Sequence, residues 1–574
     1  MREIRSPLDG FGSPFGPGRR TLTNLLFGQN EPGVTFEPWD MTTLYQDRAG
    51  TTPVTAVGQS VGLRLDKSQG LRQGPERGAA LTLAGWTVTS GVAVSGGVAT
   101  FSSAAQNSNA YNVVGTVEAG KTYRVSLTVS SYVSGTAALL LPGGSGRGAI
   151  TSNGTFTGVY TAGSTGVIYL WAQGASNNTF VISNYSVREL AGNHEVAIND
   201  AARGVYGREP EGGTRNRLTY TEQFDNAAWG KSGSTISANA IAGPDGATTA
   251  DKLVETATTS EHLVSAVNIG SAQKTASIYF KAAERTQAAI YFYNATNGVV
   301  ASYFDLSSGT VISGAGVIET VGGGWYRCSL TRTATVNDNV YFCAAVGGNT
   351  TYLGSTSSGI YIWGAQLELG ASATAYQRVV SQYDITEAGV ASCYYVQTDG
   401  VDDAYVTPTI TPGTDKVQVF AGVRKNSDVD GAVLLEHSAS INSNAGSFGI
   451  YPQGTGTDAA YTFGSRGSAL SGANFAIATP YNAPIYNVIA CLGDISGDRA
   501  ALRVNGVQVA QSTADQGTGN YLAYPAHIYA RGGTMSPFNG RDYGHAVRFG
   551  PNLDAATIAR VEALIARNTP EVTL

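Results

Sequence analysis

Alternating side chains indicate one kind of strand that occurs twice in the chain. In residues 359–369 (Gly-Ile-Tyr-Ile-Trp-Gly-Ala-Gln-Leu-Glu-Leu), aromatic and β-branched residues alternate along the chain, with large side chains on both faces. This period of two predicts a β-strand. A weaker copy lies at residues 167–173, and each copy closes a segment that opens with a Trp near turn residues, Trp86 in the first and Trp229 in the second. We therefore expect one kind of β module to be used twice.

Other alternating runs, separated by turn residues, divide the chain into segments. Their spacing is close to the roughly 8–12 residues typical of β-sandwiches. Breaker residues without periodicity fill the N-terminal part, and a polar stretch rich in Gly and Pro separates two of the modules. The pattern predicts five segments: an irregular segment at 1–80, a first sandwich at 84–190, a linker at 191–216, a second sandwich at 217–378 and a third unit at 385–574.

The third unit carries two further local signals. Asn505-Gly506 stands between two alternating runs, which predicts a β-hairpin. In residues 555–567 the apolar residues recur on one helical face, and Asn552 or Asp554 is the candidate N-cap. We predict an all-β fold: a multi-domain chain of β-sandwich or jelly-roll modules after an irregular N-terminal segment, with a short C-terminal helix.

Composition supports this fold class and limits the kinds of partner that we expect. The chain has 73 Gly and 30 Tyr but only 3 Met, and 14% of its residues are charged, which is typical of many short strands joined by tight turns. The net charge is −6 and no basic face stands out, so we expect no nucleic-acid partner. No apolar run of about 18 residues occurs, and the first residues do not resemble a signal peptide. We expect no membrane insertion, and assembly in a cytoplasm.

Several parts of the chain resemble proteins of tailed bacteriophages. Residues 4–16 and 44–67 resemble the N-terminal segment shared by many tail and fibre proteins. The order of the 218–229 opening, the Gly-Gly-Gly-Trp-Tyr turn and strand at 322–330, and the Trp-Gly-Ala-Gln-Leu-Glu strand resembles a carbohydrate-binding jelly roll of about 160 residues. The Asp-Gly-Val-Asp-Asp opening after residue 398 and the Asn-Gly hairpin resemble a concanavalin-like, or laminin-G-like, domain.

The resemblance implies a tail-fibre or tail-tip protein of the virion that binds host cell-surface polysaccharide through serial β-sandwiches. It also implies attachment to other tail proteins through residues 1–80, and a homotrimer. On this view the third unit lies farthest from the attachment segment. Two rival functions remain: an enzyme that degrades capsule or exopolysaccharide, and a purely structural spacer. We expect no enzyme, because no catalytic pair stands out and the five His show no metal-binding spacing.

Candidate binding residues fall into three groups. Asp399, Asp402 and Asp403 crowd one turn, so they either hold Ca²⁺ or bond to nearby backbone N–H groups. The resemblance implies a second structural Ca²⁺ site, where the first and last strands of the second sandwich meet. Exposed tyrosines would stack on sugar rings. The residues implied for the second Ca²⁺ site are Glu222, Asp225 and Gln366, and the candidate sugar contacts are Tyr291, Tyr293, Tyr451 and Tyr461.

Overall fold

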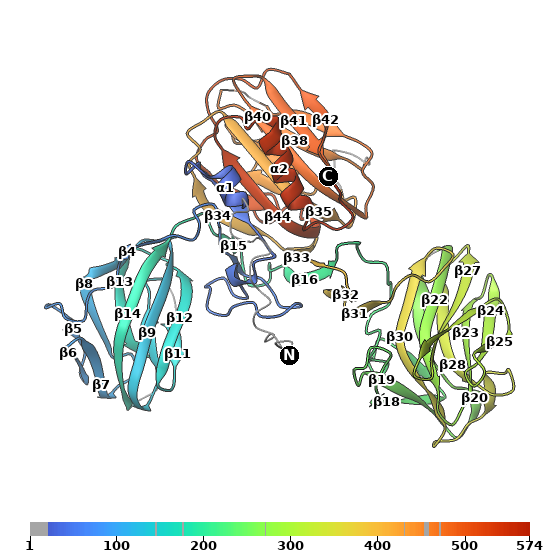
Figure 1. Cartoon of the computed structure of the whole chain (residues 1–574). Coiled ribbons are helices and arrows are strands. Elements are labelled where there is room, and N and C mark those ends of the chain that lie inside the picture. Colours follow the sequence, from blue (N-terminus) through green and yellow to red (C-terminus); the bar gives the residue numbers. More distant parts are fainter. Residues whose placement is uncertain are drawn as a thin grey trace, which may run out of the picture. The chain divides into compact units, whose positions relative to one another are not determined.

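The computed structural model describes residues 21–143, 146–174, 177–269, 271–429, 431–452, 459–469 and 472–574. The chain forms two compact units: unit 1 comprises Met1–Tyr206 and Tyr394–Leu574, and unit 2 comprises Gly207–Cys393. Nearly all regular structure is β, in several sheets, with a short helix near the C-terminus (Figure 1). The predicted all-β, multi-domain fold is confirmed. Among the described residues, no helix has the length and apolar character that crossing a membrane requires.

The first sandwich of unit 1 has a core of alternate side chains from two sheets. Along one long strand Tyr123, Val125, Leu127 and Val129 are buried while the residues between them are partly exposed, as the sequence pattern predicts. The strands are β4 (Gln73–Glu76), β5 (Thr87–Val88), β6 (Val92–Ser95), β7 (Val98–Ala104), β8 (Asn109–Val117), β9 (Thr122–Ser134), β10 (Ala137–Leu140), β11 (Gly146–Ile150), β12 (Gly154–Thr161), β13 (Gly166–Ala172) and β14 (Asn178–Leu190). The sheet orders are β11-β10-β13-β8-β5 and β12-β9-β14-β7-β6, with β4 paired to β14.

The second sandwich of unit 1 is assembled from three separate parts of the chain. Its strands are β1 (Gly33–Phe36), β2 (Leu44–Tyr45), β3 (Leu63–Arg64), β15 (Glu195–Ala197), β33 (Ser392–Asp399), β34 (Tyr405–Ile410), β35 (Lys416–Lys425), β36 (Leu435–His437), β37 (Ser447–Tyr451), β38 (Tyr461–Arg466), β39 (Asn474–Ala478), β40 (Ile485–Asp494), β41 (Arg499–Val504), β42 (Val507–Ser512), β43 (Tyr524–Ile528) and β44 (Asn539–Phe549). One sheet runs β33-β44-β35-β40-β41-β42 with β1 paired to β44, and the other runs β2-β3-β15-β34-β43-β36-β37-β38-β39.

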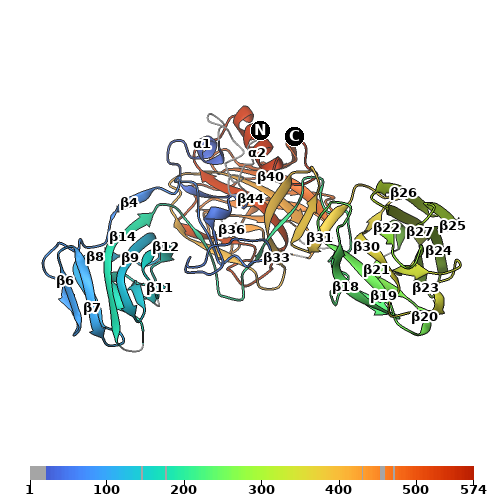
Figure 2. The ribbon, with the colours of Figure 1, turned by 60° about the horizontal axis from the view of Figure 1, so that its bottom comes forward.

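The N-terminal segment differs from the irregular, coreless stretch that we expected. Strand β1 pairs antiparallel with β44, and β2 and β3 continue the second sheet. Helix α1 (Leu22–Leu26) packs beside α2 (Ala555–Ala566), and Leu22, Leu26 and Ile558 share one buried cluster (Figures 1 and 2). A short 3₁₀ helix, η2, spans Met41–Thr43. Residues 4–16, which carry part of the phage resemblance, lie outside the described residues.

This arrangement also changes the expected role of the linker and of the third unit. Residues 195–197, expected in a linker, form β15 and pair with β3 and β34. The first sandwich is therefore inserted between two parts of one discontinuous domain. The third unit does not stand at a distance from residues 33–64, because β1, β2 and β3 complete its sheets.

Buried charges join the three parts of this domain. Arg64 of β3 forms ion pairs with Glu195 of β15 and with Asp542 of β44, and the last of these lies 3.5 Å away. The imidazole of His545 bridges the same two carboxylates. The Arg64 guanidinium also lies over the ring of Tyr405, with its central carbon 4.0 Å from the ring centroid. A buried cation is stable in a protein when carboxylates and aromatic faces surround it in this way.

Unit 2 is a sandwich of two antiparallel sheets. Its strands are β16 (Val205–Pro210), β17 (Gly230–Ser232), β18 (Ser234–Ile241), β19 (Ala250–Glu255), β20 (Thr259–Glu261), β21 (Leu263–Ile269), β22 (Ala272–Ala282), β23 (Gln287–Asn294), β24 (Gly298–Asp305), β25 (Thr310–Ser313), β26 (Val317–Gly322), β27 (Trp325–Ala334), β28 (Asp338–Ala345), β29 (Thr351–Leu353), β30 (Gly359–Leu369), β31 (Gln377–Ser381) and β32 (Asp384–Glu387). The sheet orders are β17-β21-β28-β23-β24-β25 and β18-β19-β30-β22-β27-β26; β20 pairs with β29, and β32 with β31 and β16.

Three local predictions are confirmed. The run at 359–369 is the strand β30, which lies between β19 and β22. Strands β41 and β42 form the predicted hairpin, and Asn505 and Gly506 both have positive φ, as a type I′ turn requires. Helix α2 begins after Asp554, whose side chain accepts a hydrogen bond from the N–H of Thr557.

Candidate functional site

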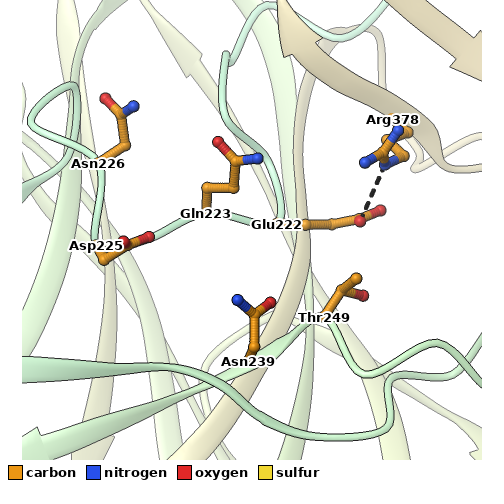
Figure 3. Close-up of a pocket in the computed structure, with 7 residues that line it drawn as sticks. All are labelled: Glu222, Gln223, Asp225, Asn226, Asn239, Thr249 and Arg378. Carbon is orange, nitrogen blue, oxygen red and sulfur yellow. Dashed lines mark hydrogen bonds and ion pairs between the residues drawn. The ribbon is translucent and has the colours of Figure 1, made fainter.

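Polar side chains surround a pocket near the start of the unit 2 sandwich. The pocket has a volume of about 270 Å³. Figure 3 shows Gln223 and Asp225 on the loop above it and Asn239 rising from β18 below. The lining residues are Glu222, Gln223, Asp225, Asn226, Asn239, Thr249 and Arg378.

Buried aromatic residues on the loop place its polar residues at the pocket. Phe224 and Trp229 are both buried in the core, with ring centroids 4.8 Å apart. The residues between and beside these two anchors therefore lie at the surface, where Gln223 and Asp225 are exposed. The hydrophobic effect that buries the two rings thus also positions the polar wall.

A buried carboxylate joins the two walls. Asp251 of β19 accepts a hydrogen bond from the backbone N–H of Phe224 and another from that of Asn239, each 2.8 Å long. Burial raises the pKa of Asp251 to about 6, and the charge of Asp225 acts in the same direction. Asn239 has a φ of 52° within a register shift of the β18–β19 pair, a conformation that Asn tolerates better than most residues.

One wall of the pocket contains an ion pair. The Nε of Arg378 lies 3.0 Å from a carboxylate oxygen of Glu222 (Figure 3). The Tyr376 hydroxyl donates to the other oxygen of Glu222. Burial raises the pKa of Glu222, although the Arg378 guanidinium opposes this shift. The Thr249 hydroxyl, another lining group, accepts a hydrogen bond from the indole N–H of Trp363 over 2.8 Å.

The structure brings two of the three residues implied for a Ca²⁺ site to this pocket. Glu222 and Asp225 line it, whereas Gln366 is 0% exposed and is not a lining residue. The Gln366 side chain donates to Glu368 over 2.6 Å and accepts from the backbone N–H of Gln377 over 2.8 Å. The pocket offers carboxylate and amide oxygens, which are donor types that Ca²⁺ accepts.

The two tyrosine candidates of unit 2 lie on the same strand in different surroundings. Tyr291 is 8% exposed; its ring stacks on Tyr341 at 4.4 Å between centroids, and its hydroxyl donates to Glu261 over 2.8 Å. Tyr293 is 43% exposed. Of this pair, Tyr293 is the side chain that a ligand can reach without a rearrangement.

The tyrosine candidates of unit 1 are buried. Tyr461 packs in the main core of the second sandwich, and the Asn487 amide donates to its hydroxyl over 3.1 Å. Tyr451 lies against Ile441, and the Arg531 guanidinium carbon is 5.4 Å from its ring centroid. Neither ring presents an open face for stacking on a sugar.

The acidic turn of unit 1 brings Asp399, Asp402 and Asp403 together, with one carboxylate oxygen from each within 4.8 Å of the others. The backbone N–H of Asp399 donates to Asp403 over 3.0 Å, and that of Val401 donates to Asp399 over 2.8 Å. Burial raises the pKa of Asp403 to about 7, and the two neighbouring carboxylates add to this shift. These hydrogen bonds to nearby backbone N–H groups are the ones expected if the aspartates stabilise a turn. The spacing of the three carboxylate oxygens also suits a Ca²⁺ ion, so both alternatives remain.

Sequence reasoning missed five lining residues: Gln223 and Asn226 of the loop itself, and the more distant Asn239, Thr249 and Arg378. Arg378 lies on β31, beyond the last strand of the sandwich sheets, and Asn239 and Thr249 belong to separate segments. None of the three is part of a spaced motif, so no local signal marks them. The register shift at Asn239 arises from the pairing of β18 with β19, so it appears only in the folded structure.

Comparisons with known proteins gave matches to solved structures. No protein-family model matches the chain, and no curated protein matches its sequence. One match is the Ruminococcus gnavus IT-sialidase CBM40 bound to alpha2,3 sialyllactose, at 15% identity over 26% of this chain and 84% of that one, with a TM-score of 0.22.

Two other solved structures match at similarly low sequence identity and TM-score. Domain 4 of AbnA, a GH43 extracellular arabinanase from Geobacillus stearothermophilus in complex with arabinotriose, shares 13% identity over 34% of this chain and 83% of that one, with a TM-score of 0.23. A putative carbohydrate binding protein from Bacteroides ovatus shares 11% identity over 49% of this chain and 74% of that one, with a TM-score of 0.19. These matches are too distant to assign a ligand to this chain.

Proposed function

We propose that this chain is a bacteriophage tail-fibre or tail-tip protein that binds glycan on the host cell surface through the polar pocket of unit 2. The observation that carries the proposal is the pocket itself, a hollow of about 270 Å³ lined by seven polar side chains. Small-molecule sites usually begin near 300 Å³. The pocket therefore suits one sugar unit of a longer glycan.

The chemistry of the lining suits hydroxyl groups. Gln223 and Asn239 offer amide donors and acceptors, Asp225 offers a carboxylate, and Thr249 offers a hydroxyl. Each sugar hydroxyl donates one hydrogen bond and accepts others, so a mixed lining can satisfy several hydroxyls together. One such site binds weakly, and several copies on one particle raise the overall affinity through avidity.

The virion context rests on the sequence resemblance and on the serial sandwiches. The proposed partners are other tail proteins, attached through the N-terminal part of unit 1, and the proposed assembly is a homotrimer. Strands β1, β2 and β3, within residues 33–64, complete the second sandwich of unit 1. Attachment to the other tail proteins would therefore use a folded domain. We place glycan binding in unit 2 and not in the C-terminal sandwich, because the polar pocket lies in unit 2.

Binding of the full-length protein to an array of bacterial surface polysaccharides tests the proposal. We expect capture of a polysaccharide by the wild type and loss of capture in Asn239→Gly, since Gly keeps the positive φ and removes the side chain. Asn107→Gly, at another positive-φ position with φ 66°, is the matched control and should bind as the wild type does. Release of shortened oligosaccharides would instead identify a degrading enzyme, and absence of any capture would favour a structural spacer. Antibody labelling of intact particles tests the virion location.

A further inference from the structure

The pocket of unit 2 presents an unbalanced negative charge to a ligand. Its one lining guanidinium, that of Arg378, is neutralised by Glu222 at 3.0 Å. The remaining ionised lining side chain is Asp225, which is exposed. Within the described residues, no hydrogen bond or ion pair holds the Asp225 carboxylate, so its charge is available to a ligand.

Charges behind the wall have the same sign. Asp251 lies buried against the pocket loop, with one oxygen on the backbone N–H of Phe224. The charges of Asp225 and Asp251 interact, and Asp245 interacts in the same way with Glu222. Asp225 is the lining charge that Arg378 does not neutralise, so the field at the pocket is negative, and Asp251 adds to it above its pKa of about 6.

A second cation near the loop does not reverse this balance. The ammonium of Lys231 lies 3.2 Å from the main-chain oxygen of Asp225, 2.9 Å from that of Asn226 and 3.1 Å from that of Trp229. It is thus committed to carbonyl groups at the end of the loop, and it is not a lining residue.

The neutral lining groups add acceptors beside the free carboxylate. The amide of Asn239 rises from β18 towards the loop that carries Gln223 and Asp225 (Figure 3). An ammonium group has three donors and no acceptor, so it needs several oxygens around it. A sugar carboxylate would meet the Asp225 charge and find no free cation in the lining.

We infer that this pocket selects a glycan that carries a protonated amine, such as an unacetylated hexosamine, over one that carries a carboxylate. The inference rests on the proposed glycan binding and names the ligand class of the same pocket. Asp225 is the residue that pairs with the amine, with Asn239 and Gln223 as further acceptors.

Isothermal titration of the full-length protein at pH 6 tests this selection with three oligosaccharides of equal length. The probes are oligomers of glucosamine, of N-acetylglucosamine and of galacturonic acid. We expect the glucosamine oligomer to bind at least about tenfold more tightly than the other two, the scale of one charge-assisted hydrogen bond. Its affinity should fall when the pH exceeds the pKa of the sugar amine.

Two matched variants locate the effect. Asp225→Asn should weaken binding of the glucosamine oligomer about tenfold and leave the N-acetylglucosamine oligomer unchanged. Glu319→Gln removes an exposed carboxylate from β26 of the same sandwich and should bind as the wild type does. Unchanged melting curves for both variants exclude a folding defect.

The outcomes separate the amine selection from glycan binding itself. Equal affinity for the three oligomers, or an Asp225→Asn variant that binds glucosamine normally, overturns the amine selection and leaves glycan binding standing. If no oligosaccharide binds, either in the titrations or on the array, both the amine selection and the proposed glycan binding are overturned. Calcium binding that Asp225→Asn abolishes, without preference among the oligosaccharides, also overturns the amine selection and identifies a metal site.

Discussion

The imidazole Nε2 of His545 lies 2.6 Å from a carboxylate oxygen of Glu195, a residue 350 positions earlier in the chain. The other ring nitrogen lies 2.7 Å from Asp542. Two carboxylates can be satisfied together only by an imidazolium, which has a donor on each nitrogen. Despite complete burial, these carboxylates raise the pKa of His545 to about 9. The charged ring therefore helps to join β15 to the C-terminal sandwich.

Stability should fall in mildly alkaline solution. The pKa of His545 is higher in the folded state than its usual value of 6.5, so its contribution is complete below pH 6.5 and is lost as the pH rises through about 9. Urea unfolding of the full chain, followed at pH 6.5 and at pH 9.5, measures this. His545→Gln should be less stable at pH 6.5 and should show a smaller loss between the two pH values. An equal loss in wild type and variant would contradict the assignment.

Removal of one partner from this buried charge cluster should destabilise unit 1 strongly. Glu195→Gln leaves the Arg64 guanidinium and the His545 ring with one carboxylate fewer in a fully buried site. Breaking a buried ion pair in this way costs about 3–5 kcal/mol. Arg560→Met, on the exposed face of α2, is the control and should change the free energy of unfolding by less than about 0.5 kcal/mol. Denaturant titration measures both variants.

The C-terminal residues should not fold without the N-terminal segment. A fragment of residues 385–574 lacks β1, β3 and β15, so the edge of β44 and the side chains of Asp542 and His545 lose their partners. We expect no cooperative melt for this fragment by circular dichroism. A fragment of residues 207–393, which forms a compact unit of its own, should melt cooperatively. A sharp melt for the first fragment would show that the inserted strands are dispensable.

Two tyrosines on β23 should respond differently to truncation. Tyr291→Ala removes a buried ring that stacks on Tyr341 and bonds to Glu261, and we expect a loss of about 3 kcal/mol in the free energy of unfolding. Tyr293→Ala, two positions along the same strand, removes an exposed ring and should change it by less than about 0.5 kcal/mol. Thermal and urea unfolding distinguish the two variants. Equal losses would indicate that Tyr293 is covered in solution.

Much of the candidate site was beyond sequence reasoning for a physical reason. Glu222 and Asp225 were found through the resemblance of the opening segment to a carbohydrate-binding jelly roll, and the structure places both at the pocket. Arg378 and Asn239 reach the pocket through the path of the chain and through a register shift, which depend on pairings with distant strands. Gln366 stands on the strand that drew attention in the sequence, yet its amide turns to Glu368.

By itself the sequence determined the all-β class, the β30 strand, the Asn505-Gly506 hairpin and the terminal helix, with Asp554 as one of two candidate caps. These features follow from period-two alternation, from turn chemistry and from capping, which act over a few neighbouring residues. Only the tertiary structure decided that β1, β2 and β3, within residues 33–64, belong to the C-terminal sandwich. Strands of two to four residues carry too little periodicity to be recognised alone, and they are held by hydrogen bonds and buried charges supplied from the far end of the chain.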